Sequence, residues 1–292
     1  MGITSFMACS HCNGTGWRSR DVNGVRRVER CNCWRDQAAR RLLKDACIPP
    51  RYQKCDFTTF ITYPNEQLIR VVAKVQEFTE AFPVVDRGLL LIGPPGIGKT
   101  HLAVAALRKA VKTKIVRGLY YDTRTLLAAI RSTYNPVTRT SEADILERVM
   151  QAELLVLDDL GAERLTDWVE EMMHLVVNTR YSNRLPTIFT SNYEDVSDID
   201  ELDSLLVRVG LRMHSRLREM CEFLEYDGPD YRDWSHPYKQ TSDDLQSRWK
   251  KEGKRRRVQR LPEKTYSRAR ARLRGGKEGQ LELGWSGGKA GS

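Results

Sequence analysis

The chain has 292 residues, of which 40% are hydrophobic, enough for one well-filled core with appendages but too few for two large domains. No apolar run approaches the roughly 18 residues that a membrane helix needs, and the start lacks a basic segment followed by an apolar one. These features disfavour the membrane and secreted classes, and the sequence predicts a soluble cytoplasmic protein. The net charge of +10 lies mostly at the end, because residues 240–292 carry fifteen Lys and Arg against six Asp and Glu, which leaves +1 for the rest.

Four of the seven cysteines form two close pairs near the start, Cys9 with Cys12 and Cys31 with Cys33. In the cytosol such pairs favour a metal over disulfides, and a separation of eighteen residues suits a tetrahedral zinc site. So short a segment would take its folding energy from the metal. Four unbound thiols are the alternative. The second pair has one intervening residue and not two, and His11 is a further candidate that could replace one of the cysteines.

Between the cysteine pairs, Asn23 and Gly24 predict the turn of a hairpin with a strand on either side. A basic amphipathic helix is expected over residues 36–46, because Ala and Leu recur at helical spacing with Arg and Lys between them. Two prolines end this helix, and a linker then leads to a second helix over residues 65–82.

A glycine-rich turn follows the apolar run 89–92 and precedes a helical pattern that begins at His101. The turn reads Gly93, Pro94, Pro95, Gly96, Ile97, Gly98, Lys99 and Thr100. Strand, glycine-rich turn and helix in this order are the context of a P-loop, whose amides hold triphosphate oxygens at the start of the helix. Lys99 is expected to reach the β- and γ-phosphates, and Thr100 to bind Mg²⁺. A plain turn is the alternative, which the complete pattern disfavours.

A buried parallel strand is predicted at residues 154–157, and it delivers Asp158 and Asp159 to the edge of the sheet where ligands bind. About sixty residues after a P-loop, this pattern predicts that Asp158 holds Mg²⁺ and Asp159 orients the attacking water. The strand 187–190 then places Asn192 where its amide can contact the γ-phosphate and that water.

The remaining elements follow from hydrophobic periodicity and turn residues. Expected are a strand at 114–121, a helix at 123–132, an exposed loop at 134–141, helices at 142–151, 167–181 and 205–220, and a strand at 221–226. On the helix 167–181, Trp168, Met172, Leu175 and Val176 are expected to face the core. Residues 240–292 are expected to be disordered, either as a salt-sensitive nucleic-acid contact or as a solubilising tail.

Five motifs occur in the order found in AAA+ ATPases, which the chain resembles over about residues 5–235. They are residues 93–100, 154–161, 190–192, Ser215-Arg216-Leu217 and Asp230-Tyr231-Arg232. Within that class the chain is most similar to the DnaC-type replicative helicase loaders of bacteria and phages, close relatives of the IstB transposition helpers. The cysteine-rich start resembles the zinc modules of the loaders.

The resemblance implies an α/β P-loop fold of three layers around a parallel sheet, with ATP and Mg²⁺ as cofactors and the nucleotide held by residues 93–101, His101 included. It also implies roles for three residues near the end of the domain. Asn192 is the sensor-1 residue, and Arg232 takes the sensor-2 place. Arg216 resembles an arginine finger offered to a neighbouring subunit, with Arg212 as its helper, so several copies are expected to assemble.

These resemblances divide the chain into four parts. They are a zinc-binding partner module at 1–46, a linker and helix at 47–85, the ATPase core at 86–235 and the basic tail at 236–292. The expected function is ATP-dependent loading of a replicative DNA helicase onto single-stranded DNA. The alternatives are an IstB-like transposition helper that acts on duplex DNA and a transposase, and a nucleotide-switched adaptor that scarcely hydrolyses ATP. The second motif ends in Asp-Asp where many AAA+ proteins have Asp-Glu, which predicts slow turnover.

Overall fold

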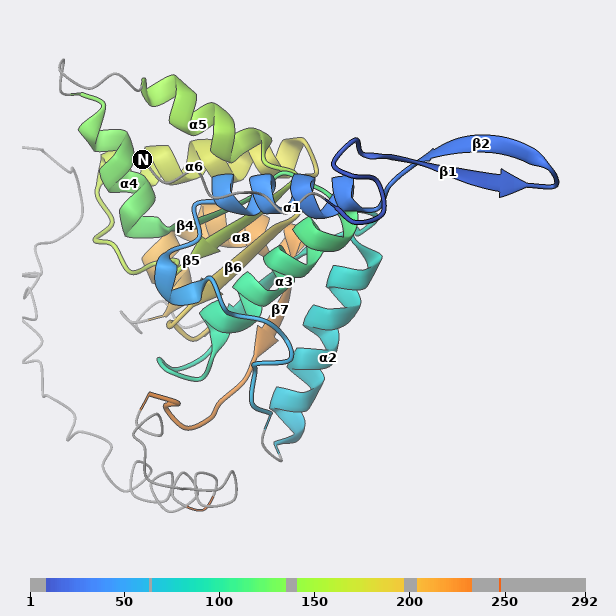
Figure 1. Cartoon of the computed structure of the whole chain (residues 1–292). Coiled ribbons are helices and arrows are strands. Elements are labelled where there is room, and N and C mark those ends of the chain that lie inside the picture. Colours follow the sequence, from blue (N-terminus) through green and yellow to red (C-terminus); the bar gives the residue numbers. More distant parts are fainter. Residues whose placement is uncertain (1–8, 63–64, 135–140, 197–203, 233–246, 248–292) are drawn as a thin grey trace, which may run out of the picture. The chain divides into compact units, whose positions relative to one another are not determined.

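The computed structural model describes residues 9–62, 65–134, 141–196, 204–232 and 247 (Figure 1). They belong to a unit that ends at Lys250. Within this described part, each helix is either too short or too polar to cross a lipid bilayer.

The core is built on a parallel sheet whose five strands lie in the order β4-β5-β6-β3-β7. The strands are β3 (Gly88–Ile92), β4 (Gly118–Asp122), β5 (Leu154–Asp158), β6 (Thr187–Ser191) and β7 (Cys221–Glu225). Every residue of β3, β5 and β6 is buried, because helices cover both faces of the sheet. Continuous apolar runs such as 89–92 are typical of strands in this position.

Helices form a layer on each face of the sheet (Figure 1). One layer holds α1 (Cys33–Asp45), α2 (Glu66–Ala81) and α3 (Lys99–Lys114), and the other holds α4 (Thr123–Ser132), α5 (Glu142–Gln151), α6 (Asp167–Ser182), α7 (Leu205–Val209) and α8 (Leu211–Met220). Side chains alternate along β3, so Leu89 and Leu91 pack with the first layer while Leu90 and Ile92 pack with the second. This arrangement confirms the predicted three-layer α/β fold.

The predicted hairpin near the start is also present. Its strands, β1 (Trp17–Val22) and β2 (Val25–Arg30), pair antiparallel with Val22 opposite Val25. Asn23 and Gly24 both have positive φ, at 53° and 77°, as a two-residue turn of this kind requires. A short 3-10 helix, η1 (Pro50–Tyr52), follows α1.

Several predicted elements differ from the structure. The helix expected over 205–220 is two helices, because Gly210 between them has φ 80° and ψ 153°, which no α-helix accommodates. The strand expected from residue 114 begins at Gly118, since α3 continues to Lys114. Leu175, expected in the core, is 41% exposed, whereas Met172 and Val176 are buried. Most of the loop predicted at 134–141 and nearly all of the tail lie outside the described residues.

A buried arginine, Arg180 on α6, links the end of α5 to the start of β6. Its side chain is 1% exposed and donates hydrogen bonds of 2.8–3.4 Å to five acceptors. They are the carbonyl oxygens of Val149, Met150, Ala152 and Pro186 and the hydroxyl of Thr187. Three of these carbonyls belong to the end of α5, where a helix leaves its last carbonyl groups without internal donors. Arg180 therefore serves as the cap of α5 and fixes it to the start of β6.

We expect Arg180→Met to lower the free energy of unfolding by about 3 kcal/mol or more, because each buried carbonyl that loses its donor costs about 1–3 kcal/mol. Urea unfolding followed by circular dichroism measures the change. Arg70→Met on α2 is the control, since that side chain is 74% exposed and its ion pair with Glu66 should contribute less than about 1 kcal/mol. Equal midpoints for the two variants would contradict this role of Arg180.

Candidate functional site

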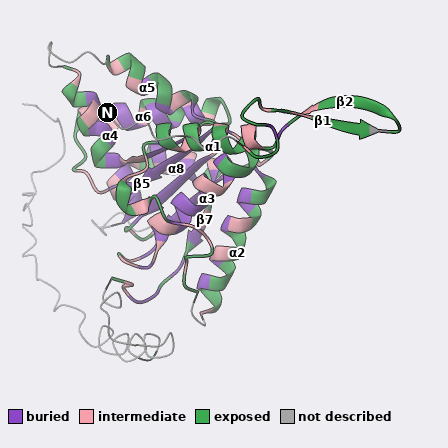
Figure 2. Cartoon of the chain, in the orientation of Figure 1, coloured by how far each residue is buried: buried purple, intermediate pink, exposed green. Residues whose placement is uncertain are grey.

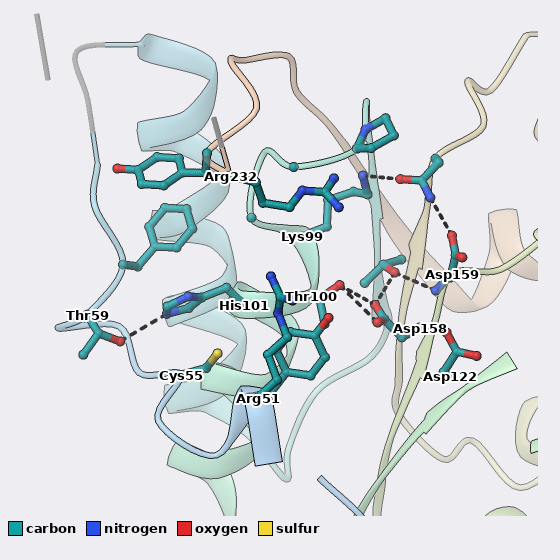
Figure 3. Close-up of a pocket in the computed structure, with 18 of the residues that line it drawn as sticks. Arg51, Cys55, Thr59, Lys99, Thr100, His101, Asp122, Asp158, Asp159 and Arg232 are labelled. Carbon is teal, nitrogen blue, oxygen red and sulfur yellow. Dashed lines mark hydrogen bonds between the residues drawn. The ribbon is translucent and has the colours of Figure 1, made fainter. Parts of the chain in front are cut away.

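A cavity of about 520 Å³ lies at the carboxyl edge of the sheet, where β3, β5 and β6 end side by side (Figure 3). Its size falls within the range of cofactor sites. Ten of the residues predicted from sequence line it, namely Pro95, Gly96, Gly98, Lys99, Thr100, His101, Asp158, Asp159, Asn192 and Arg232. The structure therefore brings the P-loop, the acidic end of β5, the Asn192 amide and Arg232 to one place.

The backbone of the glycine-rich turn adopts positive φ angles that favour glycine over other residues. Gly96 has φ 85°, and a Cβ atom there would collide with the Asp230 carboxylate. Tyr231 donates its backbone N–H to the Gly96 oxygen over 2.9 Å, so the segment that carries Arg232 rests directly on the turn. The Nε of Arg232 donates to Asp230 over 3.1 Å. Arg232, the predicted sensor-2 residue, thus lies at the cavity because its own segment contacts the P-loop.

Lys99 begins α3 and is 6% exposed. Its Nζ donates to the carbonyl oxygens of Gly93 and Pro94 over 2.6 and 2.8 Å and to Asn192 Oδ1 over 2.7 Å. Burial lowers the pKa of Lys99 to about 8, and the nearby Asp158 carboxylate opposes this shift. The three acceptors are neutral oxygens, so a phosphate entering the cavity would give this buried cation a charged partner. The residues present therefore fit a nucleotide.

Asp158 ends β5 with three hydroxyl groups around its carboxylate. Thr100 Oγ1 lies 2.9 and 3.1 Å from the two oxygens, Thr190 Oγ1 donates over 2.6 Å and the Tyr120 hydroxyl donates over 2.8 Å. Burial raises the pKa of Asp158, and these hydroxyl donors oppose the rise. A threonine hydroxyl beside a carboxylate at the start of the P-loop helix is the donor set for Mg²⁺ in P-loop enzymes. Thr100 and Asp158 fit that ion.

Asn192 connects the lysine with the second carboxylate. Its Nδ2 donates to Asp159 Oδ1 over 2.5 Å while its Oδ1 accepts from Lys99. Burial raises the pKa of Asp159, and repulsion from Asp122 and Asp158 adds to the rise. Three carboxyl groups at one end of a cavity favour a cation there, which agrees with the Mg²⁺ site.

Some site residues were not predicted from sequence. Tyr120 and Thr190 hold the Asp158 carboxylate, yet both look like ordinary strand residues in the sequence. The segment 51–61 also lines the cavity, although sequence analysis treats it as part of a linker. Nε2 of His101 lies 3.0 Å from the Asp56 oxygen and 3.2 Å from Thr59 Oγ1, which fixes this segment beside the P-loop. The sequence did hold one sign that this segment packs against the core, namely three aromatic residues at 52, 57 and 60 within a polar stretch.

Arg216 lies on α8 and does not line the cavity of its own chain. Its Nε donates to Asn178 Oδ1 on α6 over 3.0 Å, and its NH1 group donates to the Arg212 oxygen over 3.1 Å. An arginine on this surface can reach a phosphate only if another copy of the chain supplies the cavity. Its role as a finger acting between subunits remains a prediction.

The structure brings the four predicted zinc ligands together. The Sγ atoms of Cys9, Cys12, Cys31 and Cys33 all lie within 4.8 Å of one another, with 3.7 Å between Cys9 and Cys31 and 3.4 Å between Cys12 and Cys33. Four thiolates at about 2.3 Å from a tetrahedral zinc ion stand about 3.8 Å apart, so the set fits zinc. His11 is exposed and is not a member of this group.

We expect the purified protein to carry about one zinc ion per chain and Cys31→Ser to lose it. Because the metal stabilises a segment with almost no core, the amides of residues 9–35 should then lose protection from hydrogen exchange. Zinc content by mass spectrometry and exchange rates measure both effects. Cys47→Ser, at an exposed cysteine outside the cluster, should keep the metal. Full zinc content in Cys31→Ser would contradict the four-cysteine site.

The parallel sheet, the P-loop at the end of β3 and the acidic end of β5 define a P-loop ATPase of the AAA+ class. Residues 25–235 match the model of the family described as IstB-like ATP binding protein. This match covers more than half of the chain, and the protein belongs to that family. The family resemblance predicted from sequence is thereby confirmed.

Relatives of this chain include the Bacillus subtilis protein YqaM, 28% identical over 211 residues that cover 68% of this chain and 64% of YqaM. The replicative helicase loader DnaC of Escherichia coli strain K12 is 26% identical over 174 residues, which cover 59% of this chain and 66% of DnaC. The chain thus spans less than two thirds of either relative. A crystal structure of the DnaC helicase loader superimposes with a TM-score of 0.54 and 33% identity, covering 61% of this chain and 99% of that one.

Proposed function

We propose that this ATPase loads a replicative DNA helicase onto single-stranded DNA. Two of its similar proteins are named as helicase loaders, and the observation that carries the proposal is the combination of a complete nucleotide site with a separate four-cysteine module. The module at residues 1–46 grips the helicase. The linker and helix at 47–85 join it to the ATPase core at 86–235, which assembles with further copies on the DNA. Hydrolysis then releases the loader.

In this scheme ATP and Mg²⁺ bind at the cavity, and zinc binds at the cysteine cluster. Lys99 and Arg232 contact the phosphates, while Thr100 and Asp158 hold Mg²⁺. Asp159 orients the attacking water, and Asn192 positions both that carboxylate and Lys99, in agreement with its two hydrogen bonds. Arg216 acts on the nucleotide of a neighbouring copy.

Binding to a candidate replicative helicase tests the partner. The full chain should retain the helicase on an affinity resin, and Cys31→Ser should lose it while still binding ATP, because the cysteine cluster is separate from the cavity. Cys47→Ser should behave as the wild type. Retention of a transposase together with duplex DNA, and no retention of the helicase, would replace this proposal with the IstB-like alternative.

A further inference from the structure

Among its described side chains, the hairpin of β1 and β2 has no buried face. Trp17, Val25 and Val28 are 51%, 58% and 67% exposed, and the described side chains of both strands are otherwise at least partly exposed (Figure 2). Neither strand pairs with a third one among the described residues, so both long edges of this ribbon are open. Metal binding by the neighbouring cysteines does not account for these large exposed apolar side chains.

The same hairpin is strongly basic. Its two strands carry Arg18, Arg20, Arg26, Arg27 and Arg30 against Asp21 and Glu29. Arg18 pairs with Glu29 over 2.6 Å, but the register places Arg20 directly opposite Arg27. Like charges in such a pair destabilise a hairpin. An anion bound between these two arginines would remove that repulsion.

Trp17 is held in place by a stack of three side chains. The guanidinium carbon of Arg30 lies 5.4 Å from the ring centroid of Trp17 and 5.4 Å from that of Trp34. The stack orients the Trp17 indole and still leaves half of its surface exposed. A fixed aromatic ring beside arginines is what proteins use to bind single strands, because every base can stack on it while its phosphates meet the cations.

We propose that this hairpin is a single-stranded nucleic-acid site in its own right, distinct from the ATPase domain. The nucleic-acid strand wraps around the open edge of β1, so that a phosphate lies between Arg20 and Arg27 on one face of the hairpin while a base stacks on Trp17 on the other. Side chains alternate in β1, so Trp17 and Arg20 lie on opposite faces, and only a ligand at the edge reaches both. This site adds to the DNA contact proposed for the assembled ATPase domains and requires no ATP.

The test is fluorescence anisotropy of a labelled oligothymidylate titrated with the nucleotide-free full chain at several salt concentrations. The double variant Arg20→Gln/Arg27→Gln should bind roughly tenfold more weakly at low salt. The slope of the logarithm of its binding constant against the logarithm of the salt concentration should become smaller in magnitude by about 1.4, or about 0.7 for each phosphate that is no longer neutralised. Its stability and zinc content should be kept, because the change removes a repulsion. Arg40→Gln/Arg41→Gln, at two exposed arginines of α1, removes the same charge and should bind almost as the wild type.

Trp17→Ala should weaken binding by roughly fivefold to 150-fold, and Trp17→Phe should restore most of it, since phenylalanine also stacks. Equal affinities and salt slopes for the two double arginine variants would overturn the proposal, because the charge would then act without regard to position. Loss of helicase binding in Arg20→Gln/Arg27→Gln with unchanged oligonucleotide binding would also overturn it and would identify the hairpin as a protein contact.

Discussion

Lys99→Ala is expected to weaken ATP binding by roughly 10- to 150-fold and to reduce hydrolysis below detection, because a charge-assisted hydrogen bond contributes about 1.5–3 kcal/mol. The buried Nζ is held by two P-loop carbonyls and Asn192, so this cation cannot be replaced by a mobile surface lysine. Titration of a fluorescent ATP analogue and phosphate release measure the two effects.

Lys114→Ala, at the exposed end of the same helix, is the matched control and should leave both measurements unchanged. Equal ATP affinity in Lys99→Ala and the wild type would show that the nucleotide does not occupy this cavity. The fold should survive the change, because the carbonyl oxygens that Lys99 contacts lie beside an open cavity where water can replace it.

Arg216→Ala should reduce hydrolysis by about a thousandfold or more while ATP binding is retained, since an arginine finger stabilises the transition state and not the bound nucleotide. Because Arg216 lies outside the nucleotide cavity of its own chain, mixing two inactive variants can test whether it acts on a neighbouring copy. Arg216→Ala keeps an intact nucleotide site without a finger, and Lys99→Ala keeps the finger without a working site. Mixing the two inactive proteins should therefore restore hydrolysis at mixed interfaces.

Arg212→Ala tests the helper role expected for that residue and should reduce hydrolysis less than Arg216→Ala does, because the backbone oxygen of Arg212, which this change retains, is what contacts Arg216. Failure of the two inactive variants to regain activity when mixed at concentrations that support assembly would exclude a finger acting between subunits. A normal rate for Arg216→Ala alone would do the same.

The parts of the site that were predicted from sequence are those encoded by short local patterns. The P-loop and Asp158 are examples, since the order of strand, turn and helix is contained in a few adjacent residues. Thr190 and Tyr120 were missed because each meets Asp158 from another strand, more than thirty residues away in sequence. No local pattern distinguishes such a hydroxyl from any other strand residue.

The fold shows the same limit. Arg180 lies on a helix with polar and apolar residues, and sequence periodicity cannot tell that its guanidinium turns inward to the end of α5. The break at Gly210 did have a local signal, because an isolated glycine within a helical pattern often interrupts it, but the surrounding periodicity outweighed that signal. In the hairpin, the turn was predicted from Asn23 and Gly24, whereas the opposition of Arg20 and Arg27 requires the register.

The rate of ATP hydrolysis by the full chain tests the proposed function most directly, measured alone, with single-stranded DNA, with duplex DNA and with a candidate replicative helicase. Because the short Asp159 carboxylate is expected to hold water less closely than a glutamate would, we predict a basal rate below about 1 s⁻¹. Single-stranded DNA or the helicase should raise it, and Arg216→Ala should abolish the increase. A basal rate of tens per second, or stimulation by duplex DNA with no effect of the helicase, would contradict the proposed function.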